Sequence, residues 1–245
     1  MAEKVTKARR AEAIDRLRED WTETEKVILS RRSVRLYKKE QVPEFMVKRI
    51  LEAGRFAPSA GNSQPWKFVV LRDPEIIDGI TQTVIEVCTK FRNLVDYRRP
   101  QAAWSRPLVK GFIRLMRTND LHPVPFGAVG MIADKELGLW HGAPTAILIF
   151  KDVRGVSNPD LDCGIAGQNM VLAAHSMGLG TCWVGFAKMA LDYTDKWKKR
   201  LGIEFPYQFA SSLAVGWPVG KPDGMVGRQT HAVDWYEGGS KKILY

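Results

Sequence analysis

The sequence is poor in cysteine and histidine and has no long apolar run. Its 245 residues include three cysteines, none of them in a CxxC pair, and four scattered histidines. An odd cysteine count argues against a disulfide framework, and the absence of HExxH or a His/Cys cluster argues against a metal site. No stretch of about 18 apolar residues occurs, so no transmembrane helix is expected.

Residues 1–20 also lack the apolar core of a signal peptide. They are rich in charge and predict a charged helix, which makes the cytoplasm the expected location. Hydrophobic residues make up 45% and charged residues 26%, as in a soluble globular protein. We expect one domain over 1–245, because a chain of this length can bury a core of its own.

Motifs of nucleotide and hydrolase chemistry are absent as well. The stretch GLGTCWVGF fails the dinucleotide pattern GxGxxG, because Trp183 stands where the third glycine is needed and the glycines follow a helical pattern. No GxxxxGK[ST] and no GxSxG is present. A Rossmann site, a P-loop and a hydrolase elbow are therefore excluded.

The chain does have a surplus of positive charge. Its net charge is +10, and residues 90–117 hold eight Lys/Arg against one acid, Asp96. Such a balance favours anionic partners. Nucleic acid is not expected, since no zinc finger, RNP motif or recognition helix occurs.

Helix and strand patterns alternate irregularly, which predicts an α+β fold. Thr22 and Glu25 form a capping-box pattern that opens one helix. Helices are predicted at 22–30, 43–54, 158–177 and 192–202, and strands at 66–73, 145–152, 181–186 and 209–220. The stretch 85–140 is predicted to be irregular and to act as a lid or binding loop. The tail, 229–245, has no evident place in a compact monomer.

Two motifs suggest binding. In RRSVR, Arg31, Ser33 and Arg35 share one face of an extended segment, and guanidinium and hydroxyl groups suit a phosphate. A solvated basic turn is the alternative. The loop APSAGNSQPW offers a ligand its backbone amides and the side chains of Ser59, Asn62 and Gln64, although a plain loop before a strand would look similar.

Four blocks in order resemble the FMN-dependent nitroreductase family. They are RRSVRLY, LEAGRFAPSAGNSQPWKFVVL, LDCGIAGQNMVLAAHSMGLGTCWVGF and AVGWPVGKPDGMVGRQ, within 23–84 and 141–230. The resemblance implies a nitroreductase-like mixed sheet flanked by helices, in an intertwined homodimer with an exchanged C-terminal tail. It also implies one FMN at each of two interfaces, touched by both chains.

The resemblance further implies roles for individual residues. The FMN phosphate and ribityl chain would be held by Arg31, Arg32, Ser33, Arg35, Arg228 and Lys221. The flavin bound mainly by the other chain would be reached by Pro58, Ser59, Asn62 and Gln64. The isoalloxazine ring would lie along the backbone of Thr181, Cys182, Trp183, Val184 and Gly185, with an N–H near Trp183 or Gly185 directed at flavin N5. Asp162 or Gln168 would face the ring edge, and Cys163 and Cys182 would be packing residues.

The implied activity is a ping-pong transfer of hydride from NADH or NADPH, through FMN, to an aromatic or hydrophobic small molecule, anionic ones included. The chemistry would belong to the flavin, so no catalytic side chain is expected. Substrate contacts are expected from the lid residues Tyr97, Trp104, Arg106 and Lys110. Residues 104–117 alternate apolar and cationic side chains, which also fits a basic surface helix or a helix resting on anionic lipid.

Other members of the superfamily give alternatives. Iodotyrosine deiodinases share the RRSVR block, but they clamp their substrate with a lid glutamate, and none occurs here between 87 and 135. Benzimidazole synthases typically carry aspartate where Ser33 stands. A flavin-dependent oxidase or dehydrogenase, and a non-enzymatic flavin or membrane-associated binder, also remain open.

Overall fold

The computed structural model describes residues 21–95, 104, 107–108, 123–220 and 231–244. The chain divides into two units, Ser33–Lys221 and a smaller one made of Met1–Arg32 with Pro222–Tyr245. Each unit is described by itself. The helix expected at 1–20 lies outside the described residues, and the single domain over 1–245 stays a prediction.

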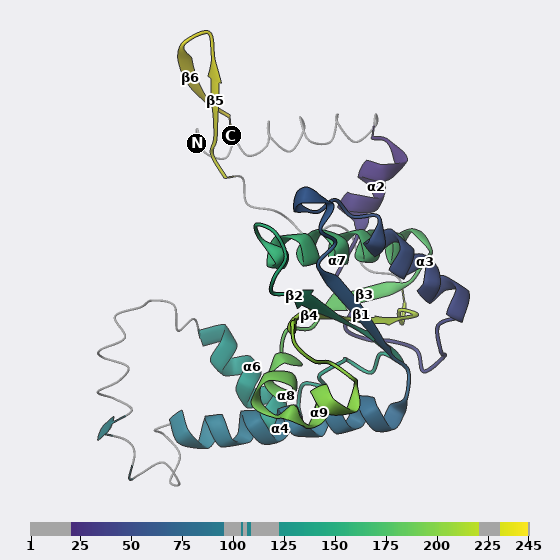
Figure 1. The fold of residues 1–245 in the computed structure, drawn as a ribbon, viewed down its shortest axis with the longest axis vertical. Coiled ribbons are helices and arrows are strands. Elements are labelled where there is room, and N and C mark those ends of the chain that lie inside the picture. Colours follow the sequence, from purple (N-terminus) through teal and green to yellow (C-terminus); the bar gives the residue numbers. More distant parts are fainter. Residues whose placement is uncertain (1–20, 96–103, 105–106, 109–122, 221–230, 245) are drawn as a thin grey trace, which may run out of the picture. The chain divides into compact units, whose positions relative to one another are not determined.

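The larger unit is built on a four-stranded sheet in the order β1-β2-β4-β3 (Figure 1). The strands are β1 Trp66–Leu71, β2 Thr145–Asp152, β3 Gly180–Trp183 and β4 Tyr207–Gly216. All three ladders are antiparallel, and a single parallel bridge joins Ser33 to Thr181. The first six residues of β2 are buried, as expected of a strand covered on both faces.

Helices cover both faces of this sheet (Figure 1). The helices α3 Glu44–Arg55 and α7 Pro159–Ser176 enclose one core with the sheet, which includes Met46, Ile50 and Met170. On the other face lie α4 Pro74–Val95, α6 Pro123–Ala133, α8 Lys188–Tyr193 and α9 Asp195–Arg200, with a second core that includes Trp197 and Phe150. The expected α+β class is confirmed.

The long helix α7 begins and packs as its sequence predicts. Asn158 accepts a hydrogen bond from the backbone N–H of Leu161 (3.1 Å), and Pro159 occupies the first turn. Gly167 packs directly against the Trp183 indole, and no larger residue would fit there, since a Cβ would lie 2.2 Å from the ring. This helix can therefore approach the sheet closely at the end of β3.

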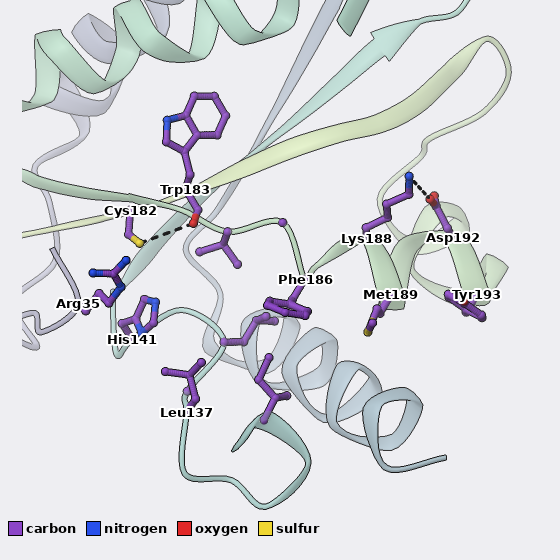
Figure 2. A pocket seen from close by; sticks show the side chains of 15 residues that line it. Arg35, Leu137, His141, Cys182, Trp183, Phe186, Lys188, Met189, Asp192 and Tyr193 are labelled. Atoms are coloured by element: carbon purple, nitrogen blue, oxygen red, sulfur yellow. Dashed lines mark hydrogen bonds and ion pairs between the residues drawn. The ribbon is translucent and has the colours of Figure 1, made fainter. Parts of the chain in front are cut away.

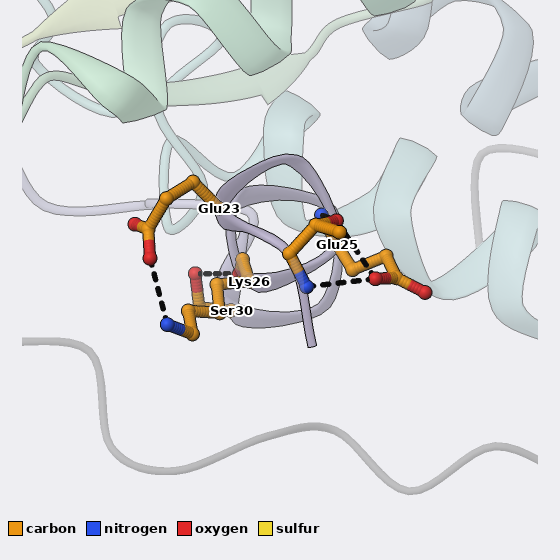
Figure 3. Close-up of polar contacts among 5 residues, drawn as sticks. Glu23, Glu25, Lys26 and Ser30 are labelled. Carbon is orange, nitrogen blue, oxygen red and sulfur yellow. Dashed lines mark hydrogen bonds and ion pairs between the residues drawn. The ribbon is translucent and has the colours of Figure 1, made fainter. Parts of the chain in front are cut away.

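In the smaller unit, the capping box is present at α2 Glu23–Ser30 (Figure 3). The Thr22 hydroxyl accepts from the Glu25 N–H (3.3 Å), and the Glu25 carboxylate accepts from the Thr22 N–H (2.8 Å). Lys26 pairs with Glu23 at 2.7 Å. The helix predicted at 22–30 is therefore confirmed, together with its start signal.

The same unit contains a β-hairpin, β5 Val233–Glu237 with β6 Ser240–Leu244. Gly238 and Gly239 form its turn with φ of 59° and 75°, a conformation that glycine adopts without strain. All of β5 is exposed. The tail thus has its own secondary structure, and its exchange between chains stays a prediction.

Two expectations about local structure are wrong. The stretch 85–140 is not irregular at its ends, because α4 extends to Val95 and α6 covers Pro123–Ala133. Ile80, Val84 and Cys88 repeat every four residues and are fully buried, which keeps α4 helical beyond residue 85. The helix predicted at 192–202 is interrupted, since Thr194 is extended (φ −140°, ψ 139°) between α8 and α9.

Among the described residues, no helix is long and apolar enough to cross a membrane.

Candidate cofactor cavity

The larger unit contains a cavity of about 800 Å³ (Figure 2). Its wall is formed by Arg35, the segment 137–141, the end of β3 with the residues that follow it, and one side of α8. This volume is within the range of small-molecule sites in proteins, about 300–1,000 Å³. Arg35, the segment 137–141 and the stretch 182–193 are far apart in sequence, and the fold brings them together.

Much of the cavity lining is apolar. Leu137, Leu139, Val184, Phe186 and Met189 contribute to its lining. Leu139 and Val184 are buried at 4% exposure, so they form a fixed surface rather than mobile side chains. A surface of this kind suits a flat ring system, whose burial is favourable in proportion to the apolar area removed from water.

Arg35 reaches the cavity because its segment is attached to β3. The N–H of Val34 donates to the carbonyl of Thr181 at 2.9 Å, next to the Ser33–Thr181 bridge. Gly180 permits this approach, since a Cβ there would lie 2.7–2.9 Å from the Val34 side chain. Arg35 therefore stands beside Cys182 at one end of the cavity (Figure 2).

His141 lies at the same end (Figure 2). It has a positive φ of 55° and precedes Gly142 at 78°, which turns the chain just before β2. Burial lowers the pKa of His141, and the nearby Arg35 guanidinium lowers it further. The imidazole is consequently neutral at neutral pH, and Arg35 supplies the positive charge at this end.

We expect an NMR titration to give His141 a pKa below the ordinary value of about 6.5. The Arg35→Met change should raise this pKa partway, because it removes the smaller of the two causes. Arg154→Met is the matched control, since it removes the same charge from a residue that does not line the cavity. A His141 pKa at or above its ordinary value would contradict the burial described here.

The lowered pKa of His141 makes the stability of the folded protein depend on pH. As pH falls below about 6.5, the unfolded chain takes up the proton on His141 before the folded chain does. The contribution of this residue to stability is therefore present above its unfolded pKa and is lost as the pH falls through its folded pKa.

Gly185 presents bare backbone to the cavity. Its neighbour Val184 is fixed to β4, because the Val184 N–H donates to the Ser212 carbonyl (2.8 Å) and the Ser212 hydroxyl donates to the Val184 carbonyl (2.5 Å). Within the described part of the chain, the N–H of Gly185 has no acceptor, and a Cβ at Gly185 would meet no atom within 4 Å. A donor and an open space are thus available at the same point of the wall.

The structure brings part of the predicted site together. The cavity is lined by Arg35, Cys182, Trp183, Val184 and Gly185. Thr181 is buried directly before them, and Ser33 pairs with it. Arg31 and Arg32 belong to the smaller unit. Five predicted residues lie outside the described residues: Tyr97, Arg106, Lys110, Lys221 and Arg228. Trp104 is described and is 75% exposed.

The polar loop at 58–64 does not line this cavity. The Ser59 hydroxyl accepts from the Gln64 N–H (2.9 Å), and the Gln64 amide donates to Asn62 (3.1 Å). Asp162 on α7 accepts from the Ala60 N–H (3.4 Å), and Pro58 is exposed. The loop is therefore ordered by its own contacts and presents polar groups outward, and its expected role at another chain's flavin stays a prediction.

The three cysteines are free and buried. Burial raises the pKa of Cys88 and Cys182, and it raises the pKa of Cys163 to about 12. Thiols of this kind stay protonated and make poor nucleophiles. Packing roles for Cys163 and Cys182 are consistent with this environment.

Several lining residues were not predicted from the sequence. They include Ile132, the segment residues Leu137, Gly138, Leu139 and His141, the loop residue Phe186, and the α8 residues Lys188, Met189, Asp192 and Tyr193. Phe186 closes the TCWVGF block, so its position next to the predicted backbone was a usable signal. The residues of α8 give no such signal, because the sequence pattern predicts a single helix at 192–202 and none that begins at Lys188.

The fold and the cavity define an α+β protein with a cavity of the size that small-molecule sites have, and comparison with known proteins identifies its family. The profile of the nitroreductase family matches residues 28–217. The chain belongs to the nitroreductase family and is an oxidoreductase of that family, which confirms the resemblance seen in its sequence.

Individual relatives agree with this. The chain is 31% identical over 161 residues to the "Putative NADH dehydrogenase/NAD(P)H nitroreductase" of Methanothermobacter thermautotrophicus, a match that covers 64% of this chain and 58% of that protein. It is 32% identical over 125 residues to iodotyrosine deiodinase 1 of Sus scrofa, covering 51% of this chain and 35% of that protein. A nitroreductase structure from Desulfitobacterium hafniense matches with a TM-score of 0.63 and 24% identity, covering 85% of this chain and 95% of the other, and shows the shared fold.

Proposed function

We propose that the protein binds FMN in the cavity and transfers hydride from NADH or NADPH to an aromatic or hydrophobic small molecule in a ping-pong reaction. The observation that carries this proposal is the wall formed by Val184 and Gly185. There the Gly185 N–H, which has no acceptor among the described residues, adjoins an apolar surface. The names of relatives support it: one is named "Putative NADH dehydrogenase/NAD(P)H nitroreductase", and the D. hafniense structure is of a nitroreductase with bound FMN.

The residues present fit this cofactor. A flat isoalloxazine suits the apolar lining around Phe186 and Leu139, and Arg35 offers a cation for the polar end of the molecule. Gly185 leaves space where any other residue would project a side chain. Bound FMN supplies the redox chemistry, accepting and returning a hydride.

The protein's own contribution is binding and electrostatics. The N–H of Gly185 would hold an acceptor atom of the ring, and Arg35 would pair with negative charge at the polar end of the cofactor. The neutral His141 next to Arg35 adds a hydrogen-bonding group without adding charge. No acid or base among the side chains is required, so we assign no catalytic residue.

We further propose that two copies of the chain form the working unit. An isolated two-stranded hairpin is marginally stable in water. Trp235, Tyr236 and Ile243 on β5 and β6 are nevertheless 46%, 72% and 63% exposed. A partner chain would cover these side chains, and the outward-facing polar loop at 58–64 would then be available to the partner's FMN.

The test is the visible spectrum of the purified protein, followed by anaerobic addition of NADH or NADPH. We expect a yellow protein that bleaches with one or both donors. If the protein is yellow but does not bleach, its electrons come from a donor other than nicotinamide, and this outcome would favour an oxidase. A colourless protein that cannot be loaded with FMN would refute the proposal.

The similarity to iodotyrosine deiodinase 1 supports one alternative activity. Reductive release of iodide from 3-iodotyrosine by the FMN-loaded protein would favour it. We also propose that the lid residues contact the substrate, whether it is a nitroaromatic compound or an iodotyrosine. These residues are Tyr97, Trp104, Arg106 and Lys110. The cytoplasmic location and the lipid contact of 104–117 likewise stay proposals.

A further inference from the structure

The cavity has two unlike ends (Figure 2). Arg35, His141 and Cys182 gather at one end, where the cofactor's polar part would bind. Lys188 and Asp192 of α8 lie at the opposite end. The cavity can therefore hold a second molecule away from Arg35, and the groups on α8 decide what that molecule is.

Lys188 is held only loosely at this end. Its ammonium lies 3.8 Å from the Asp192 carboxylate, and its side chain is 65% exposed. Asp192 has a second cation, because Lys198 lies 3.7 Å from its other oxygen. Lys188 can consequently turn toward a ligand without leaving Asp192 unpaired, and exposed pairs of this kind contribute little energy that would resist the turn.

Apolar and aromatic side chains line the same cavity as Lys188. Phe186 and Met189 line the cavity on either side of it in sequence, and Tyr193 is 70% exposed at the end of α8. With Lys198 beside Asp192, the two ion pairs described here join two cations to one anion. An aromatic ring with one negative charge is complementary to this arrangement.

We propose that Lys188 is the specificity-determining residue of the cavity and selects an aromatic carboxylate as substrate. This inference rests on the proposed function, since it places the substrate beside the bound FMN. The ring packs among Phe186, Met189 and Tyr193, and the carboxylate replaces Asp192 as the partner of the Lys188 ammonium. Charge pairing at a rim of this kind chiefly determines which ligands are admitted.

A matched pair of substrates tests the proposal. 4-Nitrobenzoate and 4-nitrobenzamide have nearly the same shape but differ by one negative charge. In the first reduction, NADH and one proton convert the nitro group to a nitroso group and water, with two electrons passing from NADH. We expect the wild-type protein to prefer the carboxylate in kcat/KM, and Lys188→Gln to lower that preference about fivefold.

Lys196→Gln is the control, because it removes the same charge from an exposed lysine of α9 that does not line the cavity. It should leave the preference as in wild type. Asp192→Asn should increase the preference, since it removes the anion that competes with the substrate. Equal treatment of the two substrates by the wild-type protein would refute the proposal, and so would equal effects of the changes at Lys188 and Lys196.

A binding measurement separates this proposal from the proposed function. Calorimetric titration of the FMN-loaded protein with benzoate and benzamide requires no turnover. Tighter binding of benzoate that is lost in Lys188→Gln supports the selective role of Lys188, even if neither nicotinamide donor bleaches the flavin. Bleaching with equal binding of benzoate and benzamide would refute the role of Lys188 and leave the proposed function standing.

Discussion

The Gly185→Leu protein is expected to fold as the wild type does but to bind FMN about a hundredfold more weakly. A Cβ at this position meets no described atom within 4 Å, so the fold has room for the side chain. The room that the leucine takes is part of the cavity. Forcing methylenes into an occupied space costs about 1–3 kcal/mol, and each step of about 1.4 kcal/mol is a factor of ten in affinity.

Fluorescence titration with FMN gives the affinity, and circular dichroism with thermal melting gives the state of the fold. Gly127→Leu is the matched control: Gly127 is exposed on α6, a Cβ there also meets no described atom within 4 Å, and the residue does not line the cavity. It should bind FMN normally. If Gly185→Leu stayed yellow with unchanged affinity, the flavin would have to bind elsewhere.

Trp197→Ala is expected to lower the free energy of unfolding by about 3–5 kcal/mol. Trp197 is 1% exposed, and its indole lies against Gly79 of α4, where a Cβ would be 2.3 Å from the ring. The indole N–H donates to the Thr83 hydroxyl at 2.9 Å. The change removes this bond and leaves a cavity between α9 and α4.

Urea unfolding measures this loss. Trp104→Ala provides the comparison, because Trp104 is 75% exposed and its truncation should change stability by no more than about 0.5 kcal/mol. Trp197→Phe should fall between the two, since it keeps most of the buried area but loses the hydrogen bond to Thr83. A loss below about 1 kcal/mol for Trp197→Ala would contradict the packing of α9 on α4.

The fold was largely predictable wherever one local signal dominated. Thr22 with Glu25, and Asn158 with Pro159, marked the starts of helices that the structure contains. The split between α8 and α9 was not predictable, because nothing local in the sequence requires an extended Thr194. Its conformation accompanies the burial of Trp197 against α4, a contact between residues more than 100 positions apart.

The same distinction applies to the site. The backbone at 181–185 was predicted because it lies inside a contiguous family block. His141 was missed because its place beside Arg35 depends on a left-handed turn before β2 and on the pairing of β2, β4 and β3. Lys188 and Asp192 were missed for a similar reason, since the cavity exists only when α8 has packed against the sheet.

The attachment of the segment 33–38 to the sheet has a consequence for solubility. β3 is an edge strand, and an uncovered edge offers unpaired backbone groups to other molecules. The Val34 N–H occupies the Thr181 carbonyl on that edge, and Tyr37 is bridged to Pro218 just beyond β4. We therefore expect the segment 33–38 to protect this edge of the sheet from edge-to-edge aggregation. Arg35 belongs to the same segment, so its positive charge lies both at the cavity and near the covered edge.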